Sequence, residues 1–408
     1  MRFLFFLITI LLTSSFAITQ DTISGFSFDH RKRSVRIPVR MSHNLIIIPM
    51  RINDSPPLNF ILDTGVNTTI LTEPLVAQVL GLELDRTAYV LGLGSDGVVE
   101  AGISSGLTFS LKDITGKNMN LIVLPEGVLS FSEIFGFPVH GIIGHDFFRE
   151  FAIRVNYRTH AIRVFRRANY RIPRKADIIP LSIRNNKPYI TISLQGRQEA
   201  KIDSLELLVD LGASFPIYLN HDYRHLSEET IPSYLGKGIS GELKGNMGRV
   251  KKIQIGEFGL NDPTVAYPQQ DFLQFAERGF TWEGILGGGI LKRFHMIIDY
   301  PSEKLVVWRN RNFRKPFTTN LSGIEIIAKG ANYDEYIINY IRPNSIADQQ
   351  DIRIGDQLVA IDNKNVEKLG VDKVFGILNR DEGTKLWLRI KRDSLYHNKM
   401  IILREDLP

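Results

Sequence analysis

Two aspartates in this sequence occupy nearly the same local setting. Each follows three apolar residues and is followed two positions later by glycine, in Asp-Thr-Gly at 63–65 and Asp-Leu-Gly at 210–212. An aspartate at the end of a buried strand can present its carboxylate where the sheet stops, and glycine lets the chain turn there. Paired carboxylates can perform acid–base chemistry, one accepting a proton and the other donating one. A single such tripeptide is more often an exposed turn, so only the pair is informative.

The segments that contain the two aspartates belong to an internal repeat. Residues 141–166 align without a gap with residues 284–309, and the segments that precede each aspartate also correspond. A repeat of roughly 145 residues is too long for a solenoid and indicates a duplicated domain. Pseudo-twofold symmetry would bring Asp63 and Asp210 to one axis, where two like charges cannot both ionise easily. One carboxyl would then keep a proton while the other acts as a base.

The elements that must position these aspartates are mainly strands. Short β-branched and aromatic segments are separated by Gly, Asn-Asp, Pro-Pro and Asn-Asn turns. Helical patterns are few, and the better candidates are residues 75–80 and 269–277. We therefore expect a mainly β protein.

The composition limits the chemistry that is available. The chain has 408 residues, of which 43% are hydrophobic and 23% charged, as in a folded protein of two or three domains. It has no cysteine, which excludes disulfides, thiolate metal sites and thiol nucleophiles. The 50 Lys and Arg against 44 Asp and Glu give a net charge of +6 without one long basic block. We expect no nucleic-acid partner.

The N-terminus is typical of an export signal. Arg2 precedes an apolar run at residues 3–12, and small residues at Ser15 and Ala17 form a cleavage site. We predict a signal peptide at 1–17 and delivery of the mature protein to the periplasm or the cell exterior. An uncleaved membrane anchor is the alternative, although the run is shorter than the roughly 20 residues that a span needs. No later segment is predicted to cross a membrane.

Several motifs together resemble the retropepsin/pepsin clan of aspartic proteases. They are the Asp-Thr-Gly motif, its Asp-Leu-Gly-Ala-Ser counterpart, and the segments Ile-Ile-Gly at 142–144 and Ile-Leu-Gly at 285–287. More narrowly, the chain resembles exported bacterial members that carry two retropepsin-like repeats before a PDZ domain. The resemblance covers residues from about 37 to 308. It implies two retropepsin-like β-barrel lobes that form one bilobal unit.

The resemblance also implies a mechanism. Asp63 and Asp210 would hold a water molecule between them. One carboxylate would remove a proton from this water as it attacks a peptide carbonyl, and the other would donate a proton to the developing oxyanion. The pair would titrate in joint steps that belong to neither residue alone.

The residues expected to support the two loops are Thr64, Gly65, Leu211 and Gly212. In the family, a Thr or Ser follows each aspartate, and the two hydroxyls brace the loops through buried hydrogen bonds. Thr64 can form such a bond and Leu211 cannot, a loss of roughly 1 kcal/mol. This departure keeps open an alternative function, that of a catalytically inactive protein that binds peptides.

The third residue after each aspartate also lacks a hydroxyl. Val66 and Ala213 stand there, as in the retroviral branch of the clan. With fewer hydrogen bonds to the ionised form, we expect the pair to titrate higher. This predicts a rate optimum at weakly acidic to neutral pH.

Two glycine-rich loops, at 92–97 and 236–241, match the dinucleotide pattern Gly-x-Gly-x-x-Gly. Each is followed by a strand-like segment and not by the helix that a dinucleotide site requires. At this place the family has a hairpin flap that closes over the substrate. The flap candidates are Gly92, Gly94, Gly97, Gly236, Gly238 and Gly241.

His221 and His225 have a spacing that could place two imidazoles on one helical face. A third ligand is not evident in the sequence, and the catalytic glutamate of His-Glu-x-x-His is missing. We expect neither a metal nor a cofactor.

The pattern changes after residue 316. The segment Pro-Asn-Ser-Ile-Ala at 343–347, the Ile-Gly-Asp turn at 354–356 and a helical segment at 371–378 resemble a bacterial PDZ domain over residues 321–403. Such domains bind an extended peptide between a strand and a helix, and backbone N–H groups receive its terminal carboxylate. The candidate peptide-binding residues are Ser322, Gly323, Ile324 and Val371.

These inferences divide the chain into the signal, a first lobe at 18–172, a second lobe at 173–316 and the PDZ domain. The predicted function is that of an exported aspartic endopeptidase whose PDZ domain docks substrate or regulates access to the active site. The expected partners are a polypeptide substrate and a C-terminal or extended peptide bound by the PDZ domain.

Overall fold

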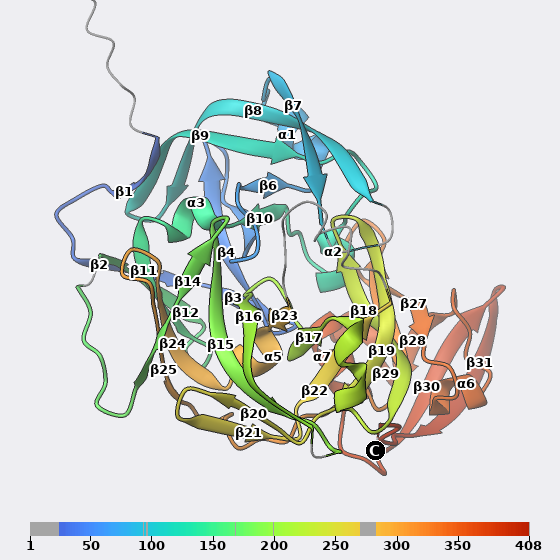
Figure 1. Cartoon of the computed structure of the whole chain (residues 1–408). Helices are drawn as coiled ribbons and strands as arrows, with labels where there is room; N and C mark the ends of the chain where they lie inside the picture. The colour runs from blue at the N-terminus through green and yellow to red at the C-terminus, as the bar shows by residue number, and fades with distance from the viewer. Residues whose placement is uncertain are drawn as a thin grey trace, which may run out of the picture.

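The computed structural model describes residues 24–92, 94, 97–167, 169–198, 200–269 and 283–407. The predicted signal at 1–17 and nearly all of the helix predicted at 269–277 lie outside these residues. Within the described part the chain is mainly β, which confirms the predicted fold class (Figure 1). The strands there form four sheets, of nine, six, ten and six strands.

The first lobe is built on the nine-stranded sheet. Antiparallel β4 and β5 place Ile47 opposite Ile61, and β10 joins β5 in parallel with Ile142 opposite Ile61. This parallel strand is buried, as its continuous apolar sequence predicts. The strands are β1 (Gly25–Phe28), β3 (Arg40–Ser42), β4 (Leu45–Ile52), β5 (Leu58–Leu62), β6 (Ile70–Leu71), β7 (Arg86–Leu91), β8 (Val98–Leu111), β9 (Ile114–Val123) and β10 (Gly141–Ile143).

The second lobe repeats this arrangement in the ten-stranded sheet. Antiparallel β15 and β16 place Tyr189 opposite Leu208, and β23 joins β16 in parallel with Ile285 opposite Leu208. The strands are β14 (Ser182–Arg184), β15 (Lys187–Gln195), β16 (Lys201–Val209), β17 (Ile217–Leu219), β18 (Thr230–Gly238), β19 (Gly241–Arg249), β20 (Lys252–Ile255), β21 (Phe258–Asn261), β22 (Thr264–Pro268) and β23 (Gly284–Leu286).

A six-stranded sheet joins the two lobes. It has the order β13-β25-β24-β11-β12-β2, and its central pair places Ile153 of β11 opposite Ile298 of β24. Because β11 and β24 are equivalent strands of the two repeats, their pairing unites the repeats in one body. The strands are β2 (Ser34–Pro38), β11 (Phe151–Asn156), β12 (Ala161–Arg166), β13 (Asp177–Pro180), β24 (Phe294–Asp299) and β25 (Lys304–Arg309).

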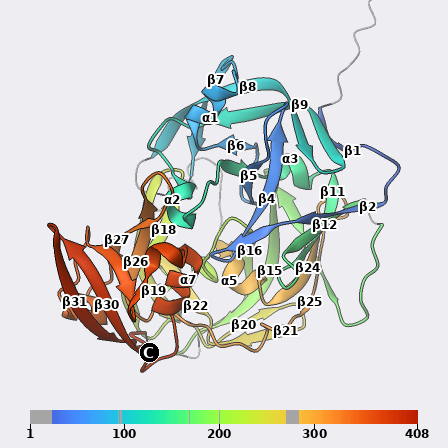
Figure 2. The same cartoon turned by 180° about the vertical axis from the view of Figure 1, so that it is seen from behind.

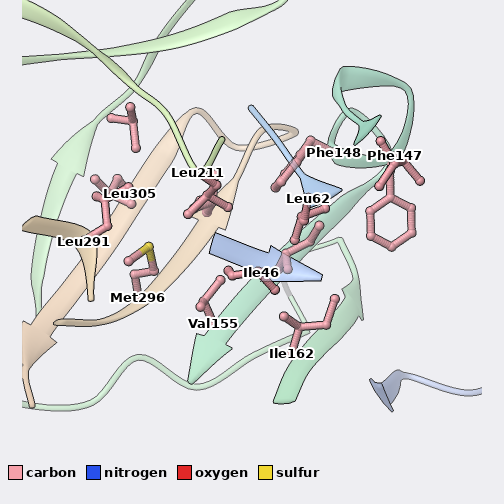
Figure 3. Packing of buried hydrophobic residues seen from close by; sticks show 14 of the residues in the cluster. Ile46, Leu62, Phe147, Phe148, Val155, Ile162, Leu211, Leu291, Met296 and Leu305 are labelled. Carbon is pink, nitrogen blue, oxygen red and sulfur yellow. The ribbon is translucent and has the colours of Figure 1, made fainter. Parts of the chain in front are cut away.

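The largest apolar cluster extends through both lobes, whereas the C-terminal domain has a cluster of its own. Figure 3 shows part of the large cluster, including Ile46, Leu62, Val155, Leu211, Leu291 and Met296. A continuous core of this kind stabilises the relative position of the lobes, since separating them would expose apolar surface to water.

Helices are short and few in the two lobes. The first coincides within one residue with the helix predicted at 75–80. None of the helices among the described residues has both the length and the apolar character needed to cross a bilayer. The helices are α1 (Pro74–Val79), α2 (Phe131–Phe135), α3 (His145–Phe148), the 3-10 helix η1 (His221–Leu226) and α5 (Gly288–Leu291).

The C-terminal domain is a six-stranded sheet with an open edge at β26 and the helix α7 beside it (Figure 2). Ser345 caps α6 by accepting a hydrogen bond from the Asp348 N–H group. The elements are β26 (Ile324–Lys329), β27 (Glu335–Ile341), α6 (Ile346–Gln349), β28 (Gln357–Ile361), β29 (Lys364–Asn365), the 3-10 helix η2 (Val366–Lys368), α7 (Val371–Leu378), β30 (Lys385–Arg392) and β31 (Leu395–Ile402).

Candidate active site

Asp63 and Asp210 emerge from equivalent strands of the two lobes. Asp63 directly follows β5, and its N–H group donates to the carbonyl of Ile143 at 2.9 Å. Asp210 directly follows β16, and its N–H group donates to the carbonyl of Leu286 at 3.0 Å. Each aspartate is therefore held by the parallel strand of its own repeat, β10 for Asp63 and β23 for Asp210. The two loops that carry the aspartates leave their sheets in the same way.

The two carboxyl groups are hydrogen-bonded to each other. Each also accepts the N–H group of the glycine two residues later, from Gly65 to Asp63 Oδ1 at 2.6 Å and from Gly212 to Asp210 Oδ1 at 2.7 Å. A Cβ atom on Gly212 would collide with the Asp63 carboxyl, and one on Gly65 would lie 3.0 Å from Asp210 Oδ2. Both glycines are thus needed for the carboxyl groups to approach.

Burial disfavours the ionised form of both carboxyls. Burial, followed by the charge of Asp210, raises the pKa of Asp63 well above its usual value. Burial also raises the pKa of Asp210, but hydrogen bonds from Asp63 and from the N–H groups of Gly212 and Ala213 act against that rise. Both carboxyls therefore resist ionisation, and the pair is expected to hold one proton and one negative charge between them.

One hydroxyl braces both loops. Thr64 is fully buried, and its Oγ1 donates to the carbonyl of Val209 at 2.6 Å and accepts the N–H group of Leu211 at 3.0 Å. Leu211 is also fully buried and belongs to the large apolar cluster, together with Leu62 (Figure 3). Lobe 1 thus supplies a polar brace to lobe 2, whereas lobe 2 supplies apolar packing in return.

Lys187 lies at this site and is absent from the residues predicted from the sequence. It lines the same cavity as Asp63 and Asp210. Burial lowers the pKa of Lys187, and the charges of Asp210 and Asp63 act to raise it. The internal repeat could have identified Lys187. It lies two residues before Tyr189, and the equivalent position of lobe 1, two residues before Ile47, holds the apolar Leu45.

The dyad opens into a cavity of about 1000 Å³ that both lobes and the C-terminal domain line. The hairpins β7/β8 and β18/β19 meet over it at their tips, where the Gly92 N–H group donates to Ser240 Oγ at 3.0 Å. Gly94 also lies against Ser240, so a side chain at Gly94 would collide with its backbone. The described residues of the two glycine-rich segments therefore lie at hairpin tips, and each segment leads into a strand.

The flap candidates differ in their positions relative to the cavity. Gly92, Gly236 and Gly238 line it, whereas Gly94 takes part in the contact between the tips. Gly97 and Gly241 are absent from the cavity lining and have backbone φ angles of +78° and +96°, which favour glycine. His221 and His225 lie on η1 with exposed side chains. Among the described residues there is no group of three or more His, Asp or Glu side chains that could hold a metal ion.

The N–H groups expected to receive a peptide carboxylate already have acceptors. Asn320 Oδ1 accepts the N–H groups of Ser322 and Gly323, each at 3.1 Å, and Ser322 Oγ accepts the Ile324 N–H group at 3.2 Å. Ser322 and Gly323 precede the strand, which begins at Ile324. Asn320 therefore occupies, with its side chain, the bonding positions that a terminal carboxylate would use.

The groove between β26 and α7, where an extended peptide would bind, contacts lobe 1 at its other end. A Cβ atom on Gly136, which ends α2, would collide with Val371 of α7 and lie 3.6 Å from the Ala328 side chain of β26. Glu133 of α2 forms an ion pair with Lys329 at 2.5 Å. In both views α2 lies beside the C-terminal domain (Figures 1 and 2). The groove between β26 and α7 is thus partly occupied by the chain itself.

Further contacts hold α7 against lobe 1. Ser42 Oγ donates to Asp372 Oδ1 at 2.5 Å, and the Arg40 guanidinium lies 3.5 Å from the same carboxylate. The His43 ring lies 5.1 Å from the Phe375 ring and 5.4 Å from the Phe135 ring. On the other side of the cavity, Tyr234 of β18 packs on Tyr340 of β27 with ring centroids 5.5 Å apart. The C-terminal domain therefore contacts both lobes.

Comparison with protein families agrees with this architecture. The aspartyl protease family model matches residues 48–147, which include Asp63, and the PDZ domain model matches residues 337–392. Asp210 lies outside the matched segments. No curated protein matches the chain significantly. The matches confirm the resemblance to an aspartic protease with a C-terminal PDZ domain.

Proposed function

We propose that the protein is an exported aspartic endopeptidase. The observation that carries this proposal is the pair of carboxyl groups, hydrogen-bonded to each other at the ends of equivalent strands and open to one cavity. Carboxyl pairs of this kind share one proton in aspartic proteases. The same proton-sharing state provides the acid and the base that hydrolysis of a peptide bond requires.

In the proposed reaction, the ionised carboxylate of Asp210 accepts a proton from the water that attacks the peptide carbonyl. The protonated carboxyl of Asp63 donates its proton to the carbonyl oxygen, which would otherwise develop a full negative charge. Asp210 then gives the proton that it took from water to the amine nitrogen as the C–N bond breaks. A hydroxyl proton of the tetrahedral intermediate returns to Asp63, which regenerates the shared-proton state. Asp210 is given the role of the base because the N–H group of Ala213 acts on it in addition to that of Gly212.

The hairpin tips and the PDZ domain control access to the pair in this proposal. The tips touch through Gly92 and Ser240, and their separation would widen the entrance for a polypeptide. The PDZ domain lines the cavity and contacts α2 with the groove that would accept an extended peptide. Of the two roles predicted for this domain, regulation of access is the one that these contacts favour.

Export remains a proposal based on the N-terminal sequence. Cleavage after Ala17 would produce a mature chain that begins at Ile18. N-terminal sequencing of protein recovered from the periplasm or the medium tests this. An N-terminus at Ile18 supports export with cleavage, and an intact Met1 in the cytoplasm contradicts it.

Leu211 supports a second candidate function, that of a peptide-binding protein without activity. The Leu211 side chain has no oxygen, so it cannot form with lobe 1 the hydrogen bonds that Thr64 forms with lobe 2. In this alternative, the cavity and the PDZ domain bind peptides, and the dyad does not hydrolyse them.

A peptide library separates the two functions. The mature protein and its Asp63→Asn variant are incubated with the library across acidic and neutral pH, with Asp203→Asn as the control because that aspartate is exposed. Cleavage by the wild type and by Asp203→Asn, but not by Asp63→Asn, supports the endopeptidase. Binding without cleavage by all three proteins supports the alternative.

A further inference from the structure

The first residue of β15 brings a lysine to the dyad. In the antiparallel pair β15/β16, Tyr189 lies opposite Leu208. Continuing this register by two residues along each strand places Lys187 opposite Asp210. Neighbours across an antiparallel pair have Cβ atoms about 4.5–5.5 Å apart. Lys187 therefore starts from the position directly across from the aspartate.

The equivalent position of lobe 1 holds an apolar residue. In the pair β4/β5, Ile47 lies opposite Ile61. The same continuation places Leu45 opposite Asp63, and Leu45 is buried. The symmetry of the repeat thus puts a cation beside one aspartate and an apolar side chain beside the other. This difference makes the two carboxyls electrostatically unequal.

The protonated form of Lys187 acts on both aspartates. Lys187 lines the cavity with both aspartates, and its charge lowers the pKa of each. Other titratable side chains packed around the pair are phenols and one imidazole. Burial raises the pKa of the phenols, which therefore stay neutral at neutral pH, and lowers the pKa of the imidazole; the phenols are Tyr189, Tyr218 and Tyr300, and the imidazole is His145.

We propose that Lys187 is a positioning residue that holds the negative charge of the dyad on Asp210. Asp210 is then the base that accepts the proton from water, and Asp63 keeps the proton that it later donates. The catalytic consequence of this placement rests on the proposed endopeptidase function. The charge placement itself is a property of the folded protein and can be measured without turnover.

The test compares Lys187→Met, which removes the charge, with Lys187→Arg, which keeps it. Titration of the aspartate carboxyl carbons by NMR in the full mature protein gives the two joint titration steps, assigned with the Asp63→Asn and Asp210→Asn variants. We expect Lys187→Met to move both steps upward by roughly one pH unit, and to reduce the share of the first ionisation that the Asp210 carboxyl carbon reports relative to that of Asp63. Lys187→Arg should remain within a few tenths of a unit of the wild type.

A control addresses unspecific loss of positive charge. Lys201 lies at the far end of the same hairpin, with a side chain that is 60% exposed. Its replacement by methionine should leave both titration steps unchanged. If Lys187→Met does not fold, Lys187→Gln retains a polar side chain and provides the same comparison.

The pH–rate profile adds a second readout. With Lys187→Met, both limbs of the profile of kcat/KM should move to higher pH by the same amount as the titration steps. Titration steps that stay within about 0.2 pH units of wild type in a folded Lys187→Met variant would overturn the inference. Shifted steps in a protein that cleaves nothing would support the role of Lys187 and overturn the proposed function.

Discussion

Lobe 1 presents Asp63 from a loop with a hydroxyl, whereas lobe 2 presents Asp210 from a loop with an apolar side chain. The backbone support is the same in both, with one hydrogen bond from each aspartate N–H group to the adjacent parallel strand and one from each glycine to a carboxyl oxygen. The brace is not the same, because Thr64 makes both of its bonds to lobe 2. A single buried hydroxyl can therefore tie the two loops together when the opposite position contributes packing.

The strands beside these loops also differ, and here lobe 1 contributes an apolar side chain and lobe 2 a charged one. When the strand registers are continued by two residues, the apolar Leu45 lies opposite Asp63 in lobe 1 and the basic Lys187 lies opposite Asp210 in lobe 2. A dyad between two identical loops would have equivalent carboxyls, whereas this one has a preferred site for the charge. The duplication thus conserves the backbone geometry and allows each lobe to contribute a different interaction.

The largest effect on stability is expected from shortening the Leu211 side chain in the loop of lobe 2. Leu211→Ala should lower the free energy of unfolding by about 2–5 kcal/mol, because it leaves a cavity in the core shared by the lobes. Leu211→Met should cost less than about 1.5 kcal/mol, since the volume is retained. Chemical denaturation measures both. Equal stability of Leu211→Ala and wild type would show that packing of Leu211 does not stabilise the core shared by the lobes.

Removing the Thr64 hydroxyl should have an effect of comparable size. Thr64→Val leaves the Val209 carbonyl and the Leu211 N–H group buried without their partner, which costs about 1–3 kcal/mol for each group left unpaired. Thr64→Ser retains the hydroxyl and serves as the control. We expect cleavage to fall with Thr64→Val and to persist with Thr64→Ser. Full activity of a folded Thr64→Val variant would mean that the loops need no brace.

The smallest effect concerns the pH dependence of stability. The pKa of Asp63 is raised on folding, so ionisation disfavours the folded state as pH rises from near 3.8, the unfolded value, through the folded value. Asp63→Asn removes this penalty and should raise the melting temperature by a few degrees at pH 7, but not near pH 3, as measured by calorimetry. A lower melting temperature at pH 7 would contradict the raised pKa.

The dyad and the fold class could be predicted from the sequence because they depend on local patterns. Apolar triplets before the two aspartates identify strand ends, and the repeat relates residues 141–166 to 284–309. These features follow from which residues neighbour one another along the chain.

Other features of the site depend on how strands and domains meet. The position of Lys187 opposite Asp210 becomes evident only when the register of β15 and β16 is known. The contact of Gly92 with Ser240 joins two hairpins from different lobes. Asn320 lies before the segment whose N–H groups it caps, and no peptide-recognition pattern includes it. The contact of Gly136 with Val371 requires the PDZ domain to be placed on lobe 1.

The most direct test of the two-carboxylate account is digestion of a denatured protein substrate in water enriched in ¹⁸O, followed by mass spectrometry of the peptides. With the wild type we expect new carboxyl termini that carry one ¹⁸O atom from solvent, and with either Asp63→Asn or Asp210→Asn we expect no new termini. Undiminished cleavage by either variant, or an intact substrate after incubation with folded wild type from about pH 4 to 8, would contradict it.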